Sequence, residues 1–270
     1  MSGAAPKRLW LIGCGNMAGA MLERWIASGT VAADAVDVVN RHDRSLPGNV
    51  RQARTLPDGP PPDLVMLGMK PQQLDEIVTT HGAAIGEAPL LVSILAGVEE
   101  ATLAARLPGP AIVRAMPNLP VALGKGVVVL HASAAPQSVK DAVAALMAPL
   151  GLVEWTDDEA MYGAMGTLEG CGPAFLFRFI DALAKAGEAL GIPADQAARL
   201  ASATVEGAAA MAAASDASPA TLADRVASPG GSTRQGLNVL DRDDVLINLL
   251  TDTLAAAERR GREMAAEAKR

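Results

Sequence analysis

The feature that most constrains the fold is a glycine-rich turn near the N-terminus, Gly13-Cys14-Gly15-Asn16-Met17-Ala18. It has the pattern G-x-G-x-x-A, and it lies between an apolar run and a stretch with helical periodicity. A strand, a glycine turn and a helix in this order are typical of the phosphate-binding start of a dinucleotide-binding domain. Gly13 permits the tight turn, and Gly15 lets the backbone approach a pyrophosphate at the helix N-terminus. We therefore predict cofactor contacts from Gly13, Gly15, Asn16, Met17 and Ala18.

The first half of the chain alternates short apolar runs with helical stretches. The runs are continuously apolar, which is typical of parallel strands covered on both faces. Residues 46–62 are rich in Pro and Gly and are interpreted as loop, with room for a short strand and helix. The pattern predicts an α/β Rossmann domain with a doubly wound, mainly parallel sheet over residues 1–156. Strands are expected at residues 9–13, 36–40, 63–70, 90–95, 111–116 and 126–131.

The pattern changes after Thr156, and no further strand is expected. Helices that are apolar on most faces need partners on most faces. We therefore predict an all-α domain over residues 157–270 that forms the core of a homodimer or of a larger assembly of dimers. Helices are expected at residues 173–190, 194–215, 218–227 and 242–268, with another beginning near Arg234.

The end of the second expected strand bears on the choice of cofactor. NAD enzymes place an Asp or Glu there to bind the ribose hydroxyls. Here the strand ends in Asn40 and Arg41 follows. An arginine attracts a 2′-phosphate that a carboxylate would repel. Asn40 and Arg41 therefore favour NADP(H).

Further cofactor contacts are expected just beyond the carboxyl ends of three other strands, where ligands bind in open α/β sheets. Lys70 and Pro71 follow one strand, together with the adjacent Met69. A flat nicotinamide ring fits against the small Ala96-Gly97 step, and Asn118 is placed to bond the ring or the ribose.

Composition excludes several classes of partner. The net charge is −7 and no Lys/Arg stripe is present, so we expect no nucleic-acid partner. The apolar stretch at residues 90–98 is far shorter than a membrane span, which needs about 18 residues, and the N-terminus lacks the pattern of a signal peptide. The two cysteines have no metal-ligand spacing, so no metal site is expected. These observations favour a cytoplasmic location.

Several segments follow in a fixed order along the chain: Gly13–Ala18, Asn40-Arg41, Met69-Lys70-Pro71, residues 93–97, residues 114–118, residues 170–175 and residues 228–233. Together they resemble the pyrroline-5-carboxylate reductase family over nearly the whole chain. The resemblance implies the last step of proline biosynthesis, with a Rossmann domain and a helical domain that interlocks into a dimer. It also implies that Ser228, Gly230, Gly231, Ser232 and Thr233 hold the carboxylate of a cyclic imine, at a glycine turn that precedes a helix.

One segment departs from the family pattern. Where the family writes Thr-Ala-Leu-Ser, this chain has Gly166-Thr167-Leu168-Glu169. The threonine that relatives often use near the substrate nitrogen therefore falls on Gly166, and the serine falls on Glu169. Thr167, Glu169 and Asp216 are the candidates for the proton donor.

We expect hydride transfer from NADPH to the imine carbon of 1-pyrroline-5-carboxylate, an oxidoreductase reaction on a CH–NH group. Positioning and electrostatics would supply most of the rate. One alternative is a related imine reductase or a β-hydroxyacid dehydrogenase, although the first long helix of the second half has Lys185 without the Lys-Asn pair of the latter. A second alternative is a non-catalytic regulator that binds NADP.

Overall fold

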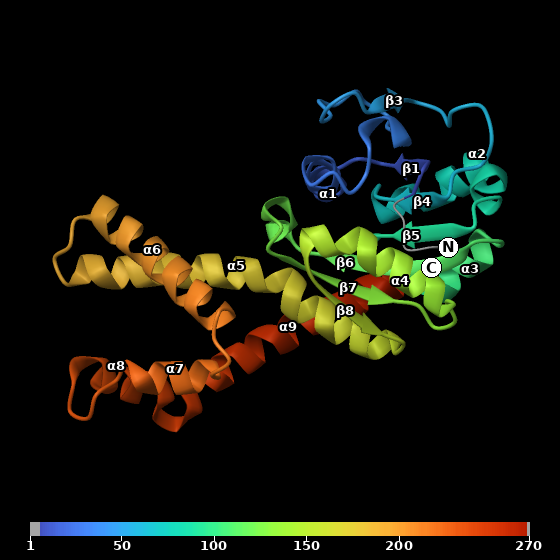
Figure 1. Cartoon of the computed structure of the whole chain (residues 1–270). Helices are drawn as coiled ribbons and strands as arrows, with labels where there is room; N and C mark the ends of the chain where they lie inside the picture. The colour runs from blue at the N-terminus through green and yellow to red at the C-terminus, as the bar shows by residue number, and fades with distance from the viewer. Residues whose placement is uncertain (1–5, 269–270) are drawn as a thin grey trace. The chain divides into compact units, whose positions relative to one another are not determined.

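The computed structural model describes residues 6–268. The first five residues of the N-terminal segment, which was compared with the pattern of a signal peptide, lie outside this range. The chain forms two compact units. Figure 1 colours the chain continuously by residue number, from the N-terminus to the C-terminus. Residues 6–171 and 257–268 lie in the first unit, and residues 172–256 form the second. The division between residues 156 and 157 that the sequence suggested stays a prediction.

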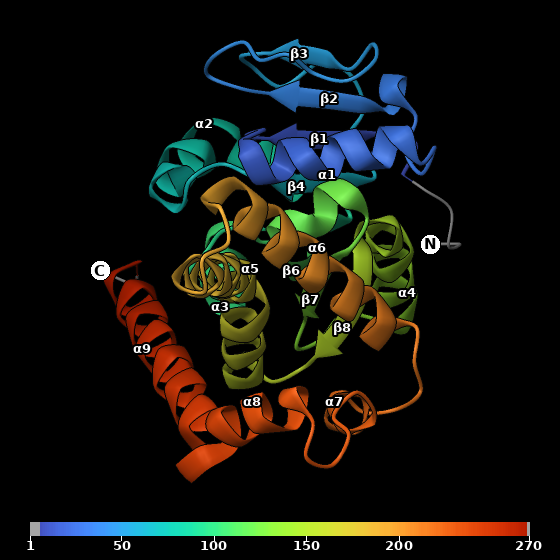
Figure 2. The ribbon, with the colours of Figure 1, turned by 90° about the vertical axis from the view of Figure 1, so that its left-hand side faces the viewer.

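A single eight-stranded sheet forms the centre of the first unit within residues 6–171, in the order β3-β2-β1-β4-β5-β6-β7-β8. Figure 2 shows β3, β2, β1 and β4 in this order, followed by β6, β7 and β8. Neighbouring strands are parallel except β6 and β7, so the predicted mainly parallel, doubly wound sheet is confirmed. The strands are β1 (Leu9–Ile12), β2 (Val36–Val39), β3 (Arg51–Ala53), β4 (Leu64–Leu67), β5 (Leu90–Ser93), β6 (Ala111–Pro117), β7 (Gly126–His131) and β8 (Gly151–Thr156).

The two edge strands are the ones that the apolar pattern did not predict. Strand β3 lies within the stretch interpreted as loop, and β8 follows the last expected strand. Both are partly exposed, whereas β1, β2, β4 and β5 are buried throughout. An edge strand has one neighbour and a solvated face, so it needs no continuous apolar run.

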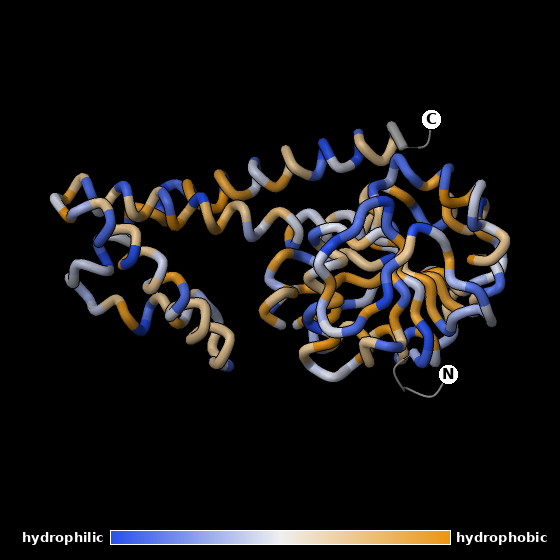
Figure 3. The backbone as a smooth tube through the Cα atoms, turned by 90° about the horizontal axis from the view of Figure 1, so that it is seen from above, coloured by the Kyte–Doolittle hydropathy of each residue, from blue (hydrophilic) through white to orange (hydrophobic). Residues whose placement is uncertain are grey.

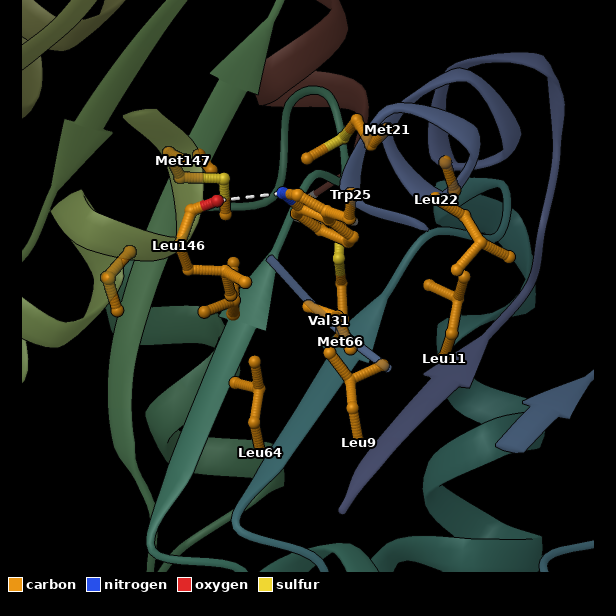
Figure 4. Packing of buried hydrophobic residues seen from close by; sticks show 14 of the residues in the cluster. Leu9, Leu11, Met21, Leu22, Trp25, Val31, Leu64, Met66, Leu146 and Met147 are labelled. Carbon is orange, nitrogen blue, oxygen red and sulfur yellow. Dashed lines mark hydrogen bonds between the residues drawn. The ribbon is translucent and has the colours of Figure 1, made fainter. Parts of the chain in front are cut away.

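Helices cover both faces of the sheet. One face packs against α1 (Asn16–Ala27) and α4 (Gln137–Met147), and the other packs against α2 (Leu74–Gly86) and α3 (Glu100–Arg106). Figure 4 shows the first of these cores, in which the Trp25 indole donates a 2.8 Å hydrogen bond to the Leu146 carbonyl. That bond satisfies the indole N–H inside an otherwise apolar cluster. The core fixes the start of α1, which lies beside the glycine loop.

The second unit consists of helices, as predicted. It contains part of α5 (Glu159–Ala189), then α6 (Ala194–Ala213), α7 (Pro219–Arg225), α8 (Ser232–Asp241) and part of α9 (Val245–Ala268). Apolar residues recur along these helices in Figure 3. Many of their large apolar side chains are exposed, among them Leu176, Phe177, Phe179, Leu200, Met211, Ile247 and Leu249.

The expectation that a helix starts at Pro173 is wrong, because α5 begins at Glu159 and continues through the proline. Proline has no N–H, so it leaves the carbonyl four residues earlier without its helical partner. That carbonyl belongs to Glu169, and the Asn118 side-chain amide donates a 3.0 Å hydrogen bond to it. The sheet therefore satisfies the group that the proline leaves unpaired, and the helix passes through.

Candidate active site

The glycine loop after β1 has the geometry that a phosphate requires. Gly13 has a φ of +82°, which side chains with a Cβ rarely adopt, and a Cβ there would lie 2.5 Å from the Met69 Cα. Gly15 precedes α1, and no side chain caps the free backbone N–H groups of that helix. The nearest atom to a Cβ at Gly15 would be 3.9 Å away, so the backbone is open there. These free N–H groups form a ready anion site.

A cavity of about 1020 Å³ lies in the first unit at the carboxyl ends of β1, β2, β4, β5 and β6. This is the edge at which open α/β sheets bind nucleotides. Most of the predicted cofactor residues line it: Gly13, Gly15, Asn16, Met17, Asn40, Arg41, Met69, Lys70, Pro71 and Ala96.

Three predicted cofactor residues do not line this cavity. Ala18 is buried in the core beneath the loop. A Cβ at Gly97, which has a φ of +74°, would face the backbone of Ala265 at 3.6 Å. Asn118 is buried, and its side-chain oxygen accepts a 2.9 Å hydrogen bond from the Val127 N–H while its nitrogen serves α5. Its amide is thus occupied by the protein.

Asn40 ties the glycine loop to the end of β2. Its side-chain oxygen accepts a 2.7 Å hydrogen bond from the Cys14 N–H, and its nitrogen donates a 3.0 Å bond to Gln52 Oε1 on β3. Both ends of the amide are therefore used. A carboxylate at this position would lose the donor to Gln52 and would place a negative charge beside the ribose end of the cavity.

The arginines after β2 differ in their surroundings. Arg41 forms an ion pair with Glu76 of α2, and both side chains are 56% exposed. Arg44 donates a 2.9 Å hydrogen bond to the Cys14 carbonyl, and Arg54 forms no ion pair with any residue of 6–268. Arg44 and Arg54 line the cavity, as Arg41 does. Arg44 and Arg54 were not predicted from the sequence, in which the available signal was the density of arginines between residues 41 and 54.

A phosphorylated dinucleotide fits these observations. The open backbone at Gly15 and the uncapped N-terminus of α1 suit a pyrophosphate. The guanidinium groups of Arg44 and Arg54, together with Lys70, supply positive charge along the same cavity. No carboxylate stands at the end of β2, where residues 39–41 read Val-Asn-Arg.

Tyr162 of α5 lines the cavity and lies against a partly buried ionic network. The Arg114 guanidinium stacks 4.3 Å from the centre of its ring and pairs with Glu159. His131 Nε2 lies 3.1 Å from carboxylate oxygens of both Glu100 and Glu159. Burial raises the pKa of the Tyr162 phenol. The network fixes the first turn of α5 to β6 and β7, and it joins residues too far apart in sequence to form a local pattern.

Glu169 is an unusual buried side chain of α5. It is 8% exposed, and neither carboxyl oxygen has a hydrogen-bond partner in the part of the chain described. Burial raises its pKa to about 8, so at pH 7 the group is mostly neutral and offers an O–H donor. It shares a buried face of α5 with Tyr162 and Gly166, and a Cβ at Gly166 would lie 2.9 Å from Met116 Cε.

The other two proton-donor candidates are Thr167 and Asp216. The Thr167 hydroxyl donates a 3.0 Å hydrogen bond to the Gly163 carbonyl one turn earlier. Asp216 is exposed in the second unit, between α6 and α7. None of the three candidates, Glu169 included, is among the residues that line the cavity.

The predicted carboxylate cradle is an exposed turn in the second unit. Gly230 has a φ of +74°, and the Gly231 N–H donates a 3.0 Å hydrogen bond to the Ser228 carbonyl. Helix α8 begins at Ser232, with Thr233 in its first turn and no side chain capping it. The turn therefore leaves backbone N–H groups available to an anion.

Two kinds of site are not found among the residues described. No cluster of three or more His, Cys, Asp or Glu side chains in residues 6–268 is arranged to hold a metal ion. Within the same residues, no helix has the length and apolar character needed to cross a bilayer.

The doubly wound sheet, the glycine loop and the cavity at its carboxyl edge define a dinucleotide-binding protein of the Rossmann class. Residues 159–264 match the family described as pyrroline-5-carboxylate reductase dimerisation. The chain is 34% identical to the pyrroline-5-carboxylate reductase of Pseudomonas aeruginosa over 268 residues, which cover 96% of this chain and 97% of the relative.

Two further relatives agree over similar lengths. The chain is 33% identical to the Synechocystis sp. pyrroline-5-carboxylate reductase, covering 95% of this chain and 98% of the relative. The solved pyrroline-5-carboxylate reductase of Coxiella burnetii is 31% identical with a TM-score of 0.87, covering 96% of this chain and 98% of that one. The chain belongs to the pyrroline-5-carboxylate reductase family.

Proposed function

We propose that this chain is an oxidoreductase that uses NADPH to reduce 1-pyrroline-5-carboxylate to proline, the last step of proline biosynthesis. The observation that carries the proposal is the similarity to relatives named pyrroline-5-carboxylate reductase over nearly the full length of both chains. The cavity at the carboxyl edge of the sheet supports it, because its glycine loop and its cationic side chains suit NADP(H).

We assign the cofactor to this cavity. The N–H groups after Gly15 would hold the pyrophosphate, together with Asn16 and Met17. Asn40 and the arginines that follow it stand at the end of β2, where the ribose of a bound dinucleotide lies. The nicotinamide would lie near Met69, Pro71 and Ala96 at the ends of β4 and β5. When bound, NADPH supplies the hydride that the imine carbon accepts.

The substrate needs two contacts from the chain. One is an anion site for its carboxylate, which we assign to the turn of residues 228–233 and to the Thr233 hydroxyl. The other is a proton for its nitrogen, since an imine is more electrophilic when protonated and the product amine keeps that proton. Positioning of these groups would supply much of the rate.

Among the candidate acids, the observations favour Glu169. An acid works best with a pKa near the working pH, and burial raises that of Glu169 to about 8. Thr167 already donates its hydroxyl hydrogen to a backbone carbonyl. Asp216 is exposed between α6 and α7 and is not buried against any part of the cavity lining.

The family match for dimerisation and the exposed apolar side chains of the second unit support self-association. We propose a homodimer as the smallest active form, since helices this apolar need partners. We also keep the prediction of a cytoplasmic location, which suits the free thiols of Cys14 and Cys171.

The decisive experiment is to follow NADPH oxidation with 1-pyrroline-5-carboxylate and to quantify proline. Stoichiometric proline is the expected result. NADPH binding without turnover would instead favour a regulator, and oxidation of a β-hydroxyacid with NADP⁺ would favour the dehydrogenase alternative.

A further inference from the structure

Four residues form a closed ring of hydrogen bonds at the ribose end of the cavity. The Cys14 N–H donates to Asn40 Oδ1, and the Asn40 amide donates to Gln52 Oε1. Gln52 holds the backbone of Arg44 from both sides, accepting from its N–H at 3.1 Å and donating to its carbonyl at 3.2 Å. The Arg44 guanidinium closes the ring on the Cys14 carbonyl at 2.9 Å.

The ring gives the Arg44 guanidinium a fixed place on the cavity wall. Its second contact is a 3.4 Å hydrogen bond from Nη2 to Asn16 Oδ1. A guanidinium carries five N–H donors, so three remain without a partner among the residues described. No carboxylate forms an ion pair with Arg44 in residues 6–268, so its charge is not neutralised.

Arg41 is closer than Arg44 to the end of β2 in the sequence, but the charge of its guanidinium is compensated. Its guanidinium is paired with the Glu76 carboxylate, and both side chains are largely exposed. A phosphate at that position would meet the negative charge of Glu76 as well as the positive charge of Arg41. Asn40 and Arg41 were predicted to favour NADP(H), and the pairing of Arg41 with Glu76 leaves Arg44 as a guanidinium whose charge is not compensated.

We propose that Arg44, held in place by Gln52, makes the dominant contact with the 2′-phosphate of NADP(H) and sets the preference for this cofactor over NAD(H). The inference rests on the proposed function, since it concerns the cofactor of that reaction. Arg44 is the binding residue. Gln52 is a positioning residue, which acts from the edge strand β3 without touching the phosphate.

Binding of two adenine nucleotides tests the proposal without any turnover. Adenosine 2′,5′-bisphosphate carries the 2′-phosphate, and 5′-AMP lacks it. Arg44→Gln should weaken binding of the bisphosphate by about ten- to a hundredfold in calorimetry, the loss expected when hydrogen bonds to a charged group are removed. Its affinity for 5′-AMP should change less than about threefold. Gln52→Leu should weaken the bisphosphate selectively but by less, and Arg44→Lys should retain part of the binding.

Two further variants complete the test. Arg41→Gln removes the competing guanidinium. Arg106→Gln is a matched control, because Arg106 pairs with Asp75 on the surface and does not line the cavity. A larger loss from Arg41→Gln than from Arg44→Gln would overturn the proposal. Equal weakening of both nucleotides by Arg44→Gln and by Arg44→Lys would also overturn it. If the wild type binds the bisphosphate selectively but makes no proline, the proposed reaction fails and the Arg44 inference stands.

Discussion

The Asn118 side chain donates a 3.0 Å hydrogen bond to the backbone carbonyl of Glu169, the carbonyl that Pro173 leaves without a helical partner. Asn118 follows β6. Glu169 lies in α5, near the point at which this helix leaves the first unit. The contact thus joins the end of the Met116-Pro117-Asn118 segment to Glu169 of α5, within the first unit. It also holds in place the turn of α5 that carries the buried Glu169 carboxyl.

We predict that Asn118→Ala lowers the free energy of unfolding by about 2–3 kcal/mol, because the Glu169 carbonyl and the Val127 N–H both lose a partner. In a Pro173→Ala background the loss should be smaller by about 1 kcal/mol, because an alanine N–H can reach the Glu169 carbonyl. A double-mutant cycle by denaturant unfolding measures the difference. Strict additivity would refute the compensation.

Substitutions at the two glycines of the loop should have different effects, one on stability and the other on NADPH binding. Gly13→Ala should destabilise the protein by about 2–4 kcal/mol, since the residue has a φ of +82° and its Cβ would overlap Met69. Gly15→Ala should fold normally, because φ is −75° and the site is open, yet it should weaken NADPH binding by at least about tenfold. Thermal melts and NADPH titrations separate the two effects. Unchanged NADPH affinity in Gly15→Ala would show that the pyrophosphate does not bind at this loop.

Glu169 predicts a distinct dependence of stability on pH. Its folded pKa is raised from 4.5 to about 8, so between these values the folded state holds a proton that the unfolded state releases. The stabilisation from this group is therefore complete below pH 4.5 and is lost as the pH rises to about 8. Glu169→Gln cannot titrate, so it should flatten this part of the profile, as urea unfolding at a series of pH values would measure. An equally steep profile in the variant would mean that another group is responsible.

The same variant tests the role of Glu169 in the reaction. If its carboxyl supplies the proton, kcat/KM of the wild type falls above about pH 8, and Glu169→Gln lowers kcat/KM and removes this limb. Thr167→Val is the matched control on the same helix and should keep the wild-type pH profile. A pH profile in Glu169→Gln that matches the wild type would show that the acid is another group.

Thr233→Val should weaken reduction of 1-pyrroline-5-carboxylate about ten- to a hundredfold in kcat/KM, because a hydrogen bond to the substrate carboxylate is lost. Reduction of 1-pyrroline, which lacks the carboxylate, should hardly change, and nor should the affinity for NADPH. Steady-state kinetics with both substrates gives the comparison. Equal losses on the two substrates would mean that the turn of residues 228–233 has only a structural role.

Self-association should depend on the apolar side chains of the second unit. Phe177 of α5 is 60% exposed in the single chain, so Phe177→Glu should shift the protein toward a monomer of 27.6 kDa in light scattering. Glu188→Gln, another exposed site on α5, is the control and should leave the mass of the assembly unchanged. A wild-type monomer at micromolar concentration would contradict the dimer itself.

The sequence by itself determined the sheet, the glycine loop and the family. Buried parallel strands are continuous apolar runs, and a turn with φ of +82° requires glycine, so both leave a local pattern that can be recognised. The family followed because the same local segments recur along the whole chain. The edge strands β3 and β8 left no such pattern, since half of their surface faces solvent.

Only the tertiary structure decided what individual polar groups do. Asn118 and Glu169 are 51 residues apart, and Cys14 and Asn40 are 26 apart, so no spacing in the sequence relates them. Folding brought Gln52 against Arg44, paired Arg41 with Glu76, and buried Glu169, which the sequence left as one of three candidate proton donors. Hydrogen bonding, charge and pKa depend on the neighbours in space, and those neighbours come from distant parts of the chain.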